Sequence, residues 1–441
     1  MGRIGLIGDN SVGYIKKLIQ IWNEGECAVL IDWRIPNNIA VEMMKEANVS
    51  RCYIDSKLAA RCSDDCVLEG IEFILFEGSS STCEFIAEDI YELYLENYCE
   101  DEAVILYSSG TTGKAKGIIL SHYAISINAD LVLEYMKLSE CDCLYIVKTL
   151  AHSSTLVGEL LVGLKAHIRI LISPTISNPR KTLQNINEHN VTTICVNPTL
   201  LELYIKTVGN RKWTFNSLKT IYTSGAIADA ALIEEAQNTI VGVQILNVYG
   251  LSEAGPRISA QRSGERRVIG SVGKVLRNVN IVIVSESGEI LPPRYKGIIH
   301  VNTPCLFSGY VAATIVRKSL YNDWFNTGDI GYVDEENNLF ITGRVDNMIT
   351  VGSHNVYPEE VEYLIKTKAN VKDCIICSQK NSVYGNKIIC YYVADFDLAS
   401  ELNEYCVANL APYEIPSEFM RIENIPVTNN GKKTRKLNGY L

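Results

Sequence analysis

Residues 107–117 combine glycines, hydroxyl side chains and lysines at a spacing that could hold a polyphosphate. The glycines free the backbone to curl, so that successive N–H groups can converge on an anion. The hydroxyls add hydrogen-bond donors, and the lysines add positive charge. We therefore predict a nucleotide phosphate site formed by Ser108, Ser109, Gly110, Thr111, Thr112, Gly113, Lys114 and Lys116.

This loop is not the common P-loop. That motif needs four residues between its two glycines and a Ser or Thr directly after its lysine. Here only two residues separate Gly110 from Gly113, and Ala115 follows Lys114. An ordinary polar turn after a strand is the alternative interpretation of the segment.

Two later motifs place a carboxylate beside a strand. Tyr249-Gly250-Leu251-Ser252-Glu253 follows an apolar run, and a hydroxyl with a carboxylate at a strand end can hold a phosphate and a magnesium ion. In Trp324-Phe325-Asn326-Thr327-Gly328-Asp329, a carboxylate fixed by a glycine turn can accept hydrogen bonds from vicinal hydroxyls such as those of ribose. Surface turns with solvated carboxylates are the alternatives.

Two basic motifs follow in the last hundred residues. Gly343-Arg344-Val345-Asp346-Asn347-Met348-Ile349 precedes a helical segment that carries Glu359, Glu360 and Glu362. Asn430-Gly431-Lys432-Lys433-Thr434-Arg435-Lys436-Leu437 lies in a polar tail. A helix start with solvated carboxylates and a solvated basic tail are the simpler interpretations of these segments.

Taken together and in this order, the five segments resemble the motifs of the adenylate-forming superfamily, which includes acyl-CoA synthetases, luciferases and the adenylation domains of peptide synthetases. The resemblance covers nearly the whole chain. It implies that Tyr249 packs on adenine, with Gly250 beside it, that Ser252 bonds the α-phosphate and that Glu253 holds magnesium. Gly225 is implied to line the nucleotide pocket. The ordered set favours catalysis over the simpler interpretations.

The resemblance also assigns the C-terminal motifs. Asp329 is implied to bind the ribose hydroxyls, and Arg344 to contact ribose and phosphate. Lys432 matches the catalytic lysine, and Asp346 matches the hinge of a small mobile domain. Family members commonly carry a lysine where this chain has Thr350, so fewer charges are expected near the thiol acceptor. Family members also have further strands and a helix before the point that matches Met1. If these elements are missing or reduced here, we expect an exposed sheet edge or an oligomer surface in their place.

The segment around His152 gives information about which acid is the substrate. Leu150-Ala151-His152 is placed where many acyl- and aryl-CoA ligases carry a histidine after an apolar pair, and a packing histidine is the alternative. Amino-acid-activating members usually carry an aspartate slightly further on, which pairs with the substrate ammonium. No aspartate occurs from Ala151 to His167. We therefore expect a carboxylic acid without an α-amine.

Alternating strand and helix patterns must position these residues. Strands are predicted by the apolar runs at 3–8, 27–32, 51–55, 103–106, 168–172, 193–196, 221–223 and 244–248. Helices are predicted between some of these strands, at 11–23, 39–47 and 181–189. From about 270 to 342, shorter runs between turn residues predict a β-rich section. The segment that follows is expected to form a helix (358–366), two strands (373–377 and 388–394) and a second helix (398–409).

The predicted fold is α/β and multidomain. Residues 1–344 are expected to form a large domain of doubly wound α/β sheets with the β-rich part at about 270–342. Residues 345–441 are expected to form a small mobile α+β domain with its hinge near Asp346.

Composition excludes several classes of function. The chain has 441 residues, 47% of them hydrophobic, and a net charge of −10 without a concentrated basic stripe, which argues against nucleic acid as the main partner. No apolar run reaches the length of a membrane span, and no signal peptide is recognisable. The 14 cysteines are scattered without zinc spacing, so we expect buried thiols in the cytoplasm, with no disulfide and no structural zinc.

These features predict ATP- and Mg²⁺-dependent activation of a carboxylic acid to an acyl-adenylate, with release of pyrophosphate and transfer to the thiol of CoA. The first alternative is a stand-alone adenylation enzyme that loads the phosphopantetheine thiol of an acyl carrier protein. The second is a degenerate member that binds nucleotide without catalysis. The presence of Lys432, Glu253 and Asp329 argues against the second alternative.

Overall fold

The computed structural model describes most of the chain, namely residues 2–58, 70–78, 82–108, 115–175, 178–209, 213–228, 230–312, 320–321, 323–352, 354–368, 370–381, 385–427 and 433–435. The chain divides into two compact units. The first comprises Met1–Ala228, Leu232–Ile281 and Val301–Asn326, and the second comprises Asp229–Ala231, Val282–His300 and Thr327–Leu441.

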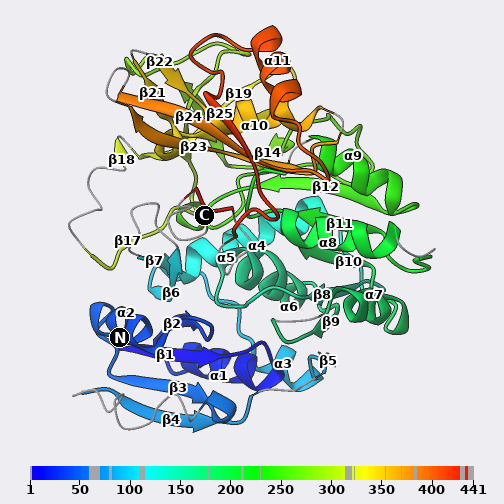
Figure 1. The fold of residues 1–441 in the computed structure, drawn as a ribbon. Coiled ribbons are helices and arrows are strands. Elements are labelled where there is room, and N and C mark those ends of the chain that lie inside the picture. Colours follow the sequence, from blue (N-terminus) through cyan, green and yellow to red (C-terminus); the bar gives the residue numbers. More distant parts are fainter. Residues whose placement is uncertain are drawn as a thin grey trace. The chain divides into compact units, whose positions relative to one another are not determined.

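The first unit begins with a seven-stranded sheet of order β17-β7-β6-β2-β1-β3-β4 (Figure 1). Its strands are β1 (Arg3–Gly8), β2 (Cys27–Asp32), β3 (Arg51–Asp55), β4 (Glu72–Phe76), β6 (Glu102–Ser108), β7 (Lys116–Ser121) and β17 (Gly309–Tyr310). The pairs β1–β2, β1–β3 and β2–β6 are parallel, whereas β7 is antiparallel to β6. Helices α1 (Val12–Asn23) and α2 (Asn37–Glu46) supply the crossovers that parallel strands require.

The second sheet of this unit has eight strands in the order β14-β13-β12-β11-β10-β8-β9-β5. They are β5 (Glu84–Phe85), β8 (Cys143–Ile146), β9 (Arg169–Ile172), β10 (Thr193–Val196), β11 (Thr220–Thr223), β12 (Gln244–Tyr249), β13 (Ser259–Ala260) and β14 (Lys274–Val275). The central strands β9, β8, β10, β11 and β12 are parallel, so their carboxyl ends meet at one edge. Three helices, α7 (Pro179–Glu188), α8 (Pro198–Gly209) and α9 (Ala230–Thr239), pack a second apolar cluster against this sheet.

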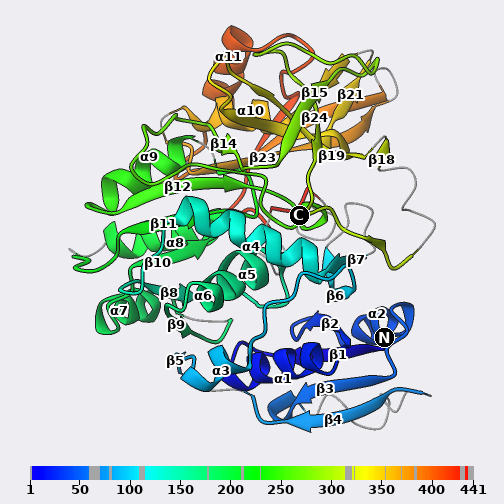
Figure 2. The ribbon, with the colours of Figure 1, turned by 180° about the vertical axis from the view of Figure 1, so that it is seen from behind.

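The largest hydrophobic core joins the two sheets of the first unit. It contains Leu30 and Leu120 from the first sheet, Leu246 from the second, and Val132 and Leu160 from helices. The helices that contribute to it are α1, α3 (Glu88–Leu93), α4 (His122–Met136), the π-helix η3 (Leu156–Leu161) and α6 (Val162–Lys165). Figure 2 shows α4 along its length. Because these side chains are removed from water on both sides, the sheet edges that carry the predicted motifs are held rigidly.

The second unit has smaller sheets. A five-stranded sheet, through which the division between the units passes, consists of β15 (Asn280–Val284), β16 (Gly297–Asn302), β18 (Leu320–Tyr321), β19 (Trp324–Val333) and β20 (Leu339–Arg344). The hairpin β21 (Ile349–Val351) and β22 (His354–Val356) follows the 3-10 turn η6 (Val345–Asn347). The three-stranded sheet β23 (Asp373–Asn381), β24 (Gly385–Val393) and β25 (Glu418–Arg421) packs with α10 (Pro358–Lys366) and α11 (Ala399–Asn409) around a separate apolar cluster.

The predicted α/β fold class is confirmed, and so are the predicted strands and helices, with ends that shift by a few residues. For example, the helix predicted at 358–366 is α10, and the strand predicted at 388–394 is part of β24. The boundary after Arg344 and the hinge at Asp346 stay predictions. Among the helices that the structure describes, none combines the length and the apolar character that a membrane crossing requires.

Candidate active site

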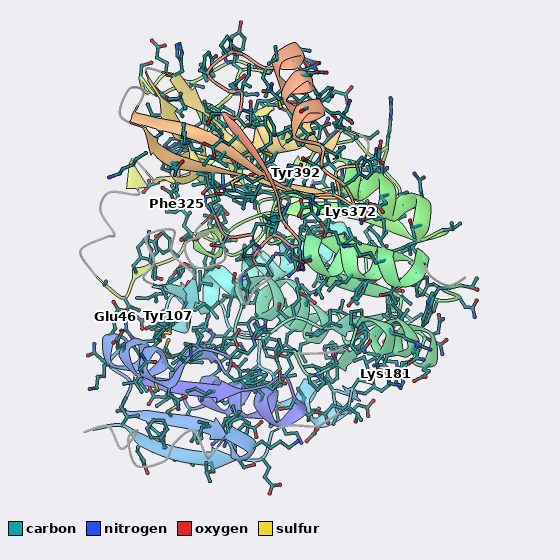
Figure 3. All side chains as sticks on the ribbon, viewed as in Figure 1. Glu46, Tyr107, Lys181, Phe325, Lys372 and Tyr392 are labelled. Atoms are coloured by element: carbon teal, nitrogen blue, oxygen red, sulfur yellow. The ribbon has the colours of Figure 1, made fainter. Side chains whose placement is uncertain are left out.

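The predicted phosphate loop joins β6 to β7. Its two described ends, Ser108 and Lys116, are register partners at the open end of this antiparallel pair. At the same end lies Tyr107, which is labelled in Figure 3. Its hydroxyl donates a 2.6 Å hydrogen bond to the carbonyl of Met43 in α2. The hairpin base is therefore tied to the first sheet and its helix. The other predicted loop residues, Ser109, Gly110, Thr111, Thr112, Gly113 and Lys114, lie outside the described residues.

Glu253, the predicted magnesium ligand, is held close to this hairpin. The hydroxyl of Tyr310 donates a 2.9 Å hydrogen bond to its Oε1 atom, and the N–H of Phe307 donates to its backbone carbonyl. Tyr310 belongs to β17, which pairs with β7, and Lys116 Nζ lies 5.7 Å from the centre of the Tyr310 ring. One tyrosine therefore connects the carboxylate to the base of the phosphate loop, although the two motifs are more than a hundred residues apart.

The backbone beside Glu253 requires glycine. A Cβ atom at Gly250 would lie 1.8 Å from the carbonyl oxygen of Pro256, so no other residue fits without a shift of the backbone. Tyr249 ends β12 and is half-buried, and its carbonyl accepts from the N–H of Ile258. Gly225 follows β11 at the same edge of the sheet and has a φ of 91°, a conformation that favours glycine.

Ser252 meets the segment that carries His152. The Oγ atoms of Ser252 and Ser153 lie 2.7 Å apart. His152 begins the short helix α5 (Ser153–Thr155), where its Nδ1 atom lies 3.0 Å from Ser154 Oγ. The structure thus brings the predicted α-phosphate contact and the predicted acid-binding histidine together, at the carboxyl ends of the strands in the second sheet.

In the second unit, Asp329 and Arg344 are register partners on β19 and β20. Arg344 Nε lies 3.3 Å from Asp329 Oδ1, and the aspartate side chain is 9% exposed. The N–H of Asp329 donates to Thr327 Oγ1, and Gly328 has a φ of 70°, so the turn fixes the direction of the carboxylate. The pairing brings the predicted ribose ligand and the predicted phosphate ligand side by side.

Lys432 lies outside the described residues, but the chain just after it is anchored. Arg435 Nη2 lies 2.8 Å from Glu359 Oε1 in α10, and Arg435 Nη1 donates to Glu362 and, at 2.7 Å, to the carbonyl of Ile376. Burial lowers the pKa of Arg435, but the carboxylates of Glu362 and Glu359 more than offset this effect and raise it. A permanently charged arginine therefore fixes the tail three residues beyond the predicted catalytic lysine.

The residues around Glu253 fit a magnesium ion that is bound together with a nucleotide. In the described part of the chain, no cluster of three or more His, Cys, Asp or Glu side chains could hold a metal alone. Mg²⁺ is usually held by one or two carboxylates, several waters and the phosphates of a substrate. A single carboxylate with one oxygen fixed by Tyr310 matches this mode of binding.

Several residues of the site escaped sequence reasoning. Tyr310 has no motif around it, because its role depends on the pairing of β17 with β7. The carboxylates of α10 were open to interpretation as a solvated face, and this is wrong for Glu359 and Glu362, which bind Arg435. Their spacing of three residues was an available signal, since it places both side chains on one face of a helix.

The fold is of the α/β class, and several predicted site residues follow the carboxyl ends of parallel strands. A profile of the family described as AMP-binding enzyme matches residues 2–311, and a profile of its C-terminal domain matches residues 360–432. The chain belongs to this family, the adenylate-forming superfamily, as the motifs predicted.

Curated relatives of the chain include CoA ligases. The 2-succinylbenzoate–CoA ligase of Enterococcus faecalis is 24% identical over 98% of this chain and 86% of that ligase. The oxalate–CoA ligase of Arabidopsis thaliana is 26% identical over 78% of this chain and 68% of that ligase. The chain is thus an AMP-forming acid–thiol ligase of the acyl- or aryl-CoA synthetase type, with ATP, Mg²⁺ and CoA as its cofactors and co-substrates.

Solved structures share the fold. ATP-bound MatB from Rhodopseudomonas palustris has a TM-score of 0.89 at 21% identity, and covers 99% of this chain and 88% of its own. The o-succinylbenzoate–CoA synthetase MenE from Bacillus subtilis, in complex with ATP and magnesium, has a TM-score of 0.82 at 23% identity over 98% of this chain and 88% of its own.

Proposed function

We propose that this enzyme joins a carboxylic acid without an α-amine to AMP and then to CoA, with the roles divided among the residues as follows. The loop between β6 and β7, with Ser108 and Lys116 at its base, binds the β- and γ-phosphates of ATP. Ser252 and Glu253 act at the α-phosphate, Glu253 through magnesium. Asp329 binds the ribose, and Arg344 contacts ribose and phosphate. Tyr249, Gly250 and Gly225 form the adenine pocket.

The chemistry follows from the charges of the reactants. A carboxylate is a poor electrophile, so its oxygen first attacks the α-phosphorus of ATP in line and pyrophosphate leaves. All the reactants are anions, so catalysis consists largely of charge neutralisation and positioning. Lys432 bridges the carboxylate and the α-phosphate. Glu253 would hold a magnesium ion, which would supply further positive charge. A thiolate then attacks the acyl carbon and AMP leaves.

The same pocket must serve both half-reactions. We infer that residues 345–441 rotate as a small domain relative to residues 1–344, with the hinge at Asp346 in η6. In the first orientation, Lys432 reaches the carboxylate. In the second, it is withdrawn and the thiol enters.

The observation that best supports this assignment is the hydrogen bond from Tyr310 to Glu253. It holds a carboxylate beside the base of a glycine-rich loop, and the hydroxyl of Ser252 lies next to that carboxylate in the chain. A metal-bound triphosphate needs this combination of a carboxylate, a hydroxyl and a phosphate loop. Structural turns alone give no reason for the two motifs to converge.

The preference for an acid without an α-amine is supported by the segment around His152. The acids in the two relatives' names, oxalate and 2-succinylbenzoate, carry no amine. The only carboxylate of residues 151–167 is Glu159, which is fully buried and pairs with Lys148 at 2.9 Å. It is therefore engaged by a cation of the protein and not open to a substrate ammonium.

Pyrophosphate exchange into ATP, measured over a panel of carboxylic and amino acids, tests the proposal. We expect exchange with at least one acid that lacks an α-amine, and AMP release only when a thiol is added. Exchange confined to amino acids, or none with any acid, would contradict the proposal. Comparison of turnover with free CoA and with a carrier protein addresses the alternative acceptor, which Thr350 keeps open.

The cysteines support a reducing location. In the described residues, most of them are buried, and Cys374, Cys390 and Cys406 belong to one apolar cluster in the second unit. Buried thiols packed as small apolar side chains are typical of the cytoplasm. We propose this location for the enzyme.

A further inference from the structure

The turn after β1 makes a set of hydrogen bonds with the segment that carries His152. Asn10, in this turn, is 4% exposed, and its side-chain amide binds three backbone groups of the loops after β8 and β9. Its Oδ1 atom accepts from the N–H of Leu150 at 2.9 Å, and its Nδ2 atom donates to the carbonyls of Lys148 at 2.8 Å and Ser173 at 3.2 Å. Because one acceptor and two donors are all engaged, the orientation of the amide is fixed.

Asn10 is itself held by its neighbours in the turn. Its N–H donates to Asp9 Oδ1 at 2.8 Å, and the same oxygen accepts from the N–H of Thr175 at 2.8 Å. The fully buried Ser11 is the N-cap of α1, where its Oγ atom accepts from the N–H of Tyr14. The position of the amide is therefore set by the first sheet, by α1 and by the loop after β9.

The backbone around His152 is held on both sides of the histidine. Asn10 binds the N–H of Leu150 ahead of it. After it, the carbonyl of His152 accepts from the N–H of Thr155 at 3.0 Å, and its Nδ1 atom accepts from the N–H of Ser154 at 3.3 Å. One residue separates Leu150 from His152, so a displacement of the Leu150 backbone also displaces the imidazole.

Other contacts of the same segment act at different points. Lys148 Nζ lies 2.9 Å from Glu159 Oε1 in η3, and the carbonyl of Ser154 accepts from Arg257 Nη2 at 3.2 Å. The first contact acts on a side chain, and the second acts on the backbone beyond the histidine. Asn10 complements them, because it binds the backbone ahead of the histidine.

The chemistry of the three backbone groups explains why the residue is an asparagine. One N–H and two carbonyls need an acceptor and two donors, which a side-chain amide supplies and a carboxylate does not. Leu150 is 1% exposed and Ser173 is 2% exposed, so water does not replace the amide unless the backbone moves. Loss of the amide should therefore shift the segment that leads to His152.

We propose that Asn10 is a positioning residue for the acid, because it fixes the backbone of Leu150 and thereby places His152 beside the carboxylic acid. The inference rests on the function proposed above and adds a residue to it. Reaction rates depend steeply on placement, and an error of about 1 Å can cost ~100-fold. The three hydrogen bonds act on the segment assigned to the acid, so their loss should affect the acid and not ATP.

Pyrophosphate exchange by Asn10→Ala tests the proposal, with rates expressed per folded molecule. With an acid that the wild type activates, kcat/KM for the acid should fall roughly 10- to 100-fold, while the KM for ATP stays within about twofold of the wild type. Asn185→Ala is the matched control, since this asparagine is also 4% exposed and donates to the hydroxyl of Tyr145 at 2.9 Å. It should lose stability but keep both kinetic constants.

Asn10→Asp serves where the alanine variant does not fold, because it preserves the size and the acceptor and removes both donors. Its kcat/KM for the acid should also fall. A wild-type value in either variant, or an equal rise in the KM for ATP, would overturn the inference and leave the proposed function standing. If the wild type activates no acid at all, the proposed function fails, and this inference fails with it.

Hydrogen exchange provides a readout that does not depend on turnover. In the wild type, the amide of Leu150 should be protected, and in Asn10→Asp the peptide 148–152 should lose protection while β10 keeps it. Loss of protection in both regions would indicate general destabilisation and count against a positioning role. Rapid exchange of the Leu150 amide in the wild type would show that the contact is not maintained in solution, and the inference would be wrong.

Discussion

Arg435 Nη2 and Glu359 Oε1 lie 2.8 Å apart, and this pair ties the C-terminal tail to the first turn of α10. Asn347 of η6 donates to the same carboxylate oxygen at 2.6 Å. The proposed hinge and the segment next to the proposed catalytic lysine therefore share one anchor. A charge network of this kind can keep Lys432 in register while its domain moves.

Glu359→Ala should lower the rate of pyrophosphate exchange about tenfold with little change in the KM for ATP, because Lys432 would be less well positioned. Glu360→Ala is the matched control on the same helical turn, since Glu360 pairs with Lys296 and not with the tail. Steady-state exchange kinetics of the two variants measure the difference. Equal effects of both substitutions would show that the anchor has no role in positioning.

Lys432→Ala should nearly abolish carboxylate-dependent pyrophosphate exchange, because no other cation is proposed to bridge the two anions. Thioester formation from preformed acyl-adenylate should be affected much less. Lys433→Ala, which removes a lysine paired with Asp373, is the control and should retain exchange. Normal exchange in Lys432→Ala would remove this lysine from the mechanism.

Tyr310→Phe should raise the Mg²⁺ concentration that gives half-maximal exchange by several-fold, because the carboxylate of Glu253 loses the hydrogen bond that fixes it. Glu253→Gln should be more severe, since it removes the charge itself. Tyr295→Phe, at a side chain that is 62% exposed, provides the matched control. A magnesium dependence identical to that of the wild type would argue that Tyr310 only packs.

Asp329→Ala should raise the KM for ATP roughly 10- to 100-fold, because two hydrogen bonds to a charged acceptor are lost. The wild type should discriminate against 2′,3′-dideoxy-ATP by a similar factor, and Asp329→Ala should not discriminate. Comparing both nucleotides with both proteins isolates the contact to the hydroxyls. Full discrimination in the variant would place the ribose elsewhere.

The stability of the first unit should depend on pH through Asp142. Burial acts to raise the pKa of this carboxyl, but hydrogen bonds from Lys219 and from Ser139 outweigh it and lower the pKa to about 2, below the ordinary 3.8. A lowered pKa gives stability that is present above pH 4 and is lost as the pH falls toward 2. The free energy of unfolding of Asp142→Asn at pH 7 should therefore be about 1 kcal/mol lower than that of the wild type. The difference is smaller than the pKa shift alone would give, because the exposed Lys219 is screened by solvent.

Denaturant titrations of the wild type and Asp142→Asn at several pH values measure this effect. The difference in the free energy of unfolding should shrink between pH 4 and pH 2. A difference that is constant over this range would mean that the side chain acts through shape and not through charge.

The strands and helices were predictable because apolar residues in the sequence recur with the spacing typical of a β-strand or of an α-helix. The strand at 193–196 and the helix at 358–366 have the predicted bounds. The order of strands within the sheets was not predictable, since it depends on contacts between distant segments. For this reason Glu253 was expected at the site while its partner Tyr310, on a two-residue strand, was not.

The burial of Glu159 and Arg257 beside Lys148 escaped sequence reasoning for a related reason. A single Lys, Glu or Arg in a sequence is usually a surface residue, and only the fold reveals that Glu159 and Arg257 are buried and that the half-buried Lys148 pairs with Glu159. The motif residues could be predicted because each motif is continuous in the chain. Lys148, Glu159 and Arg257 come from three separate segments and follow no local pattern.

The π-helical turn at Leu156–Leu161 also bears on how the interior of this enzyme can change in evolution. Deleting one residue there would restore regular α-helical winding and rotate every preceding side chain by about 100° relative to those that follow. Glu159 would then turn away from Lys148, and a deletion of three nucleotides would break their ion pair. A change in chain length would thus rearrange the buried interior at this point in one step, whereas substitutions would alter it one side chain at a time.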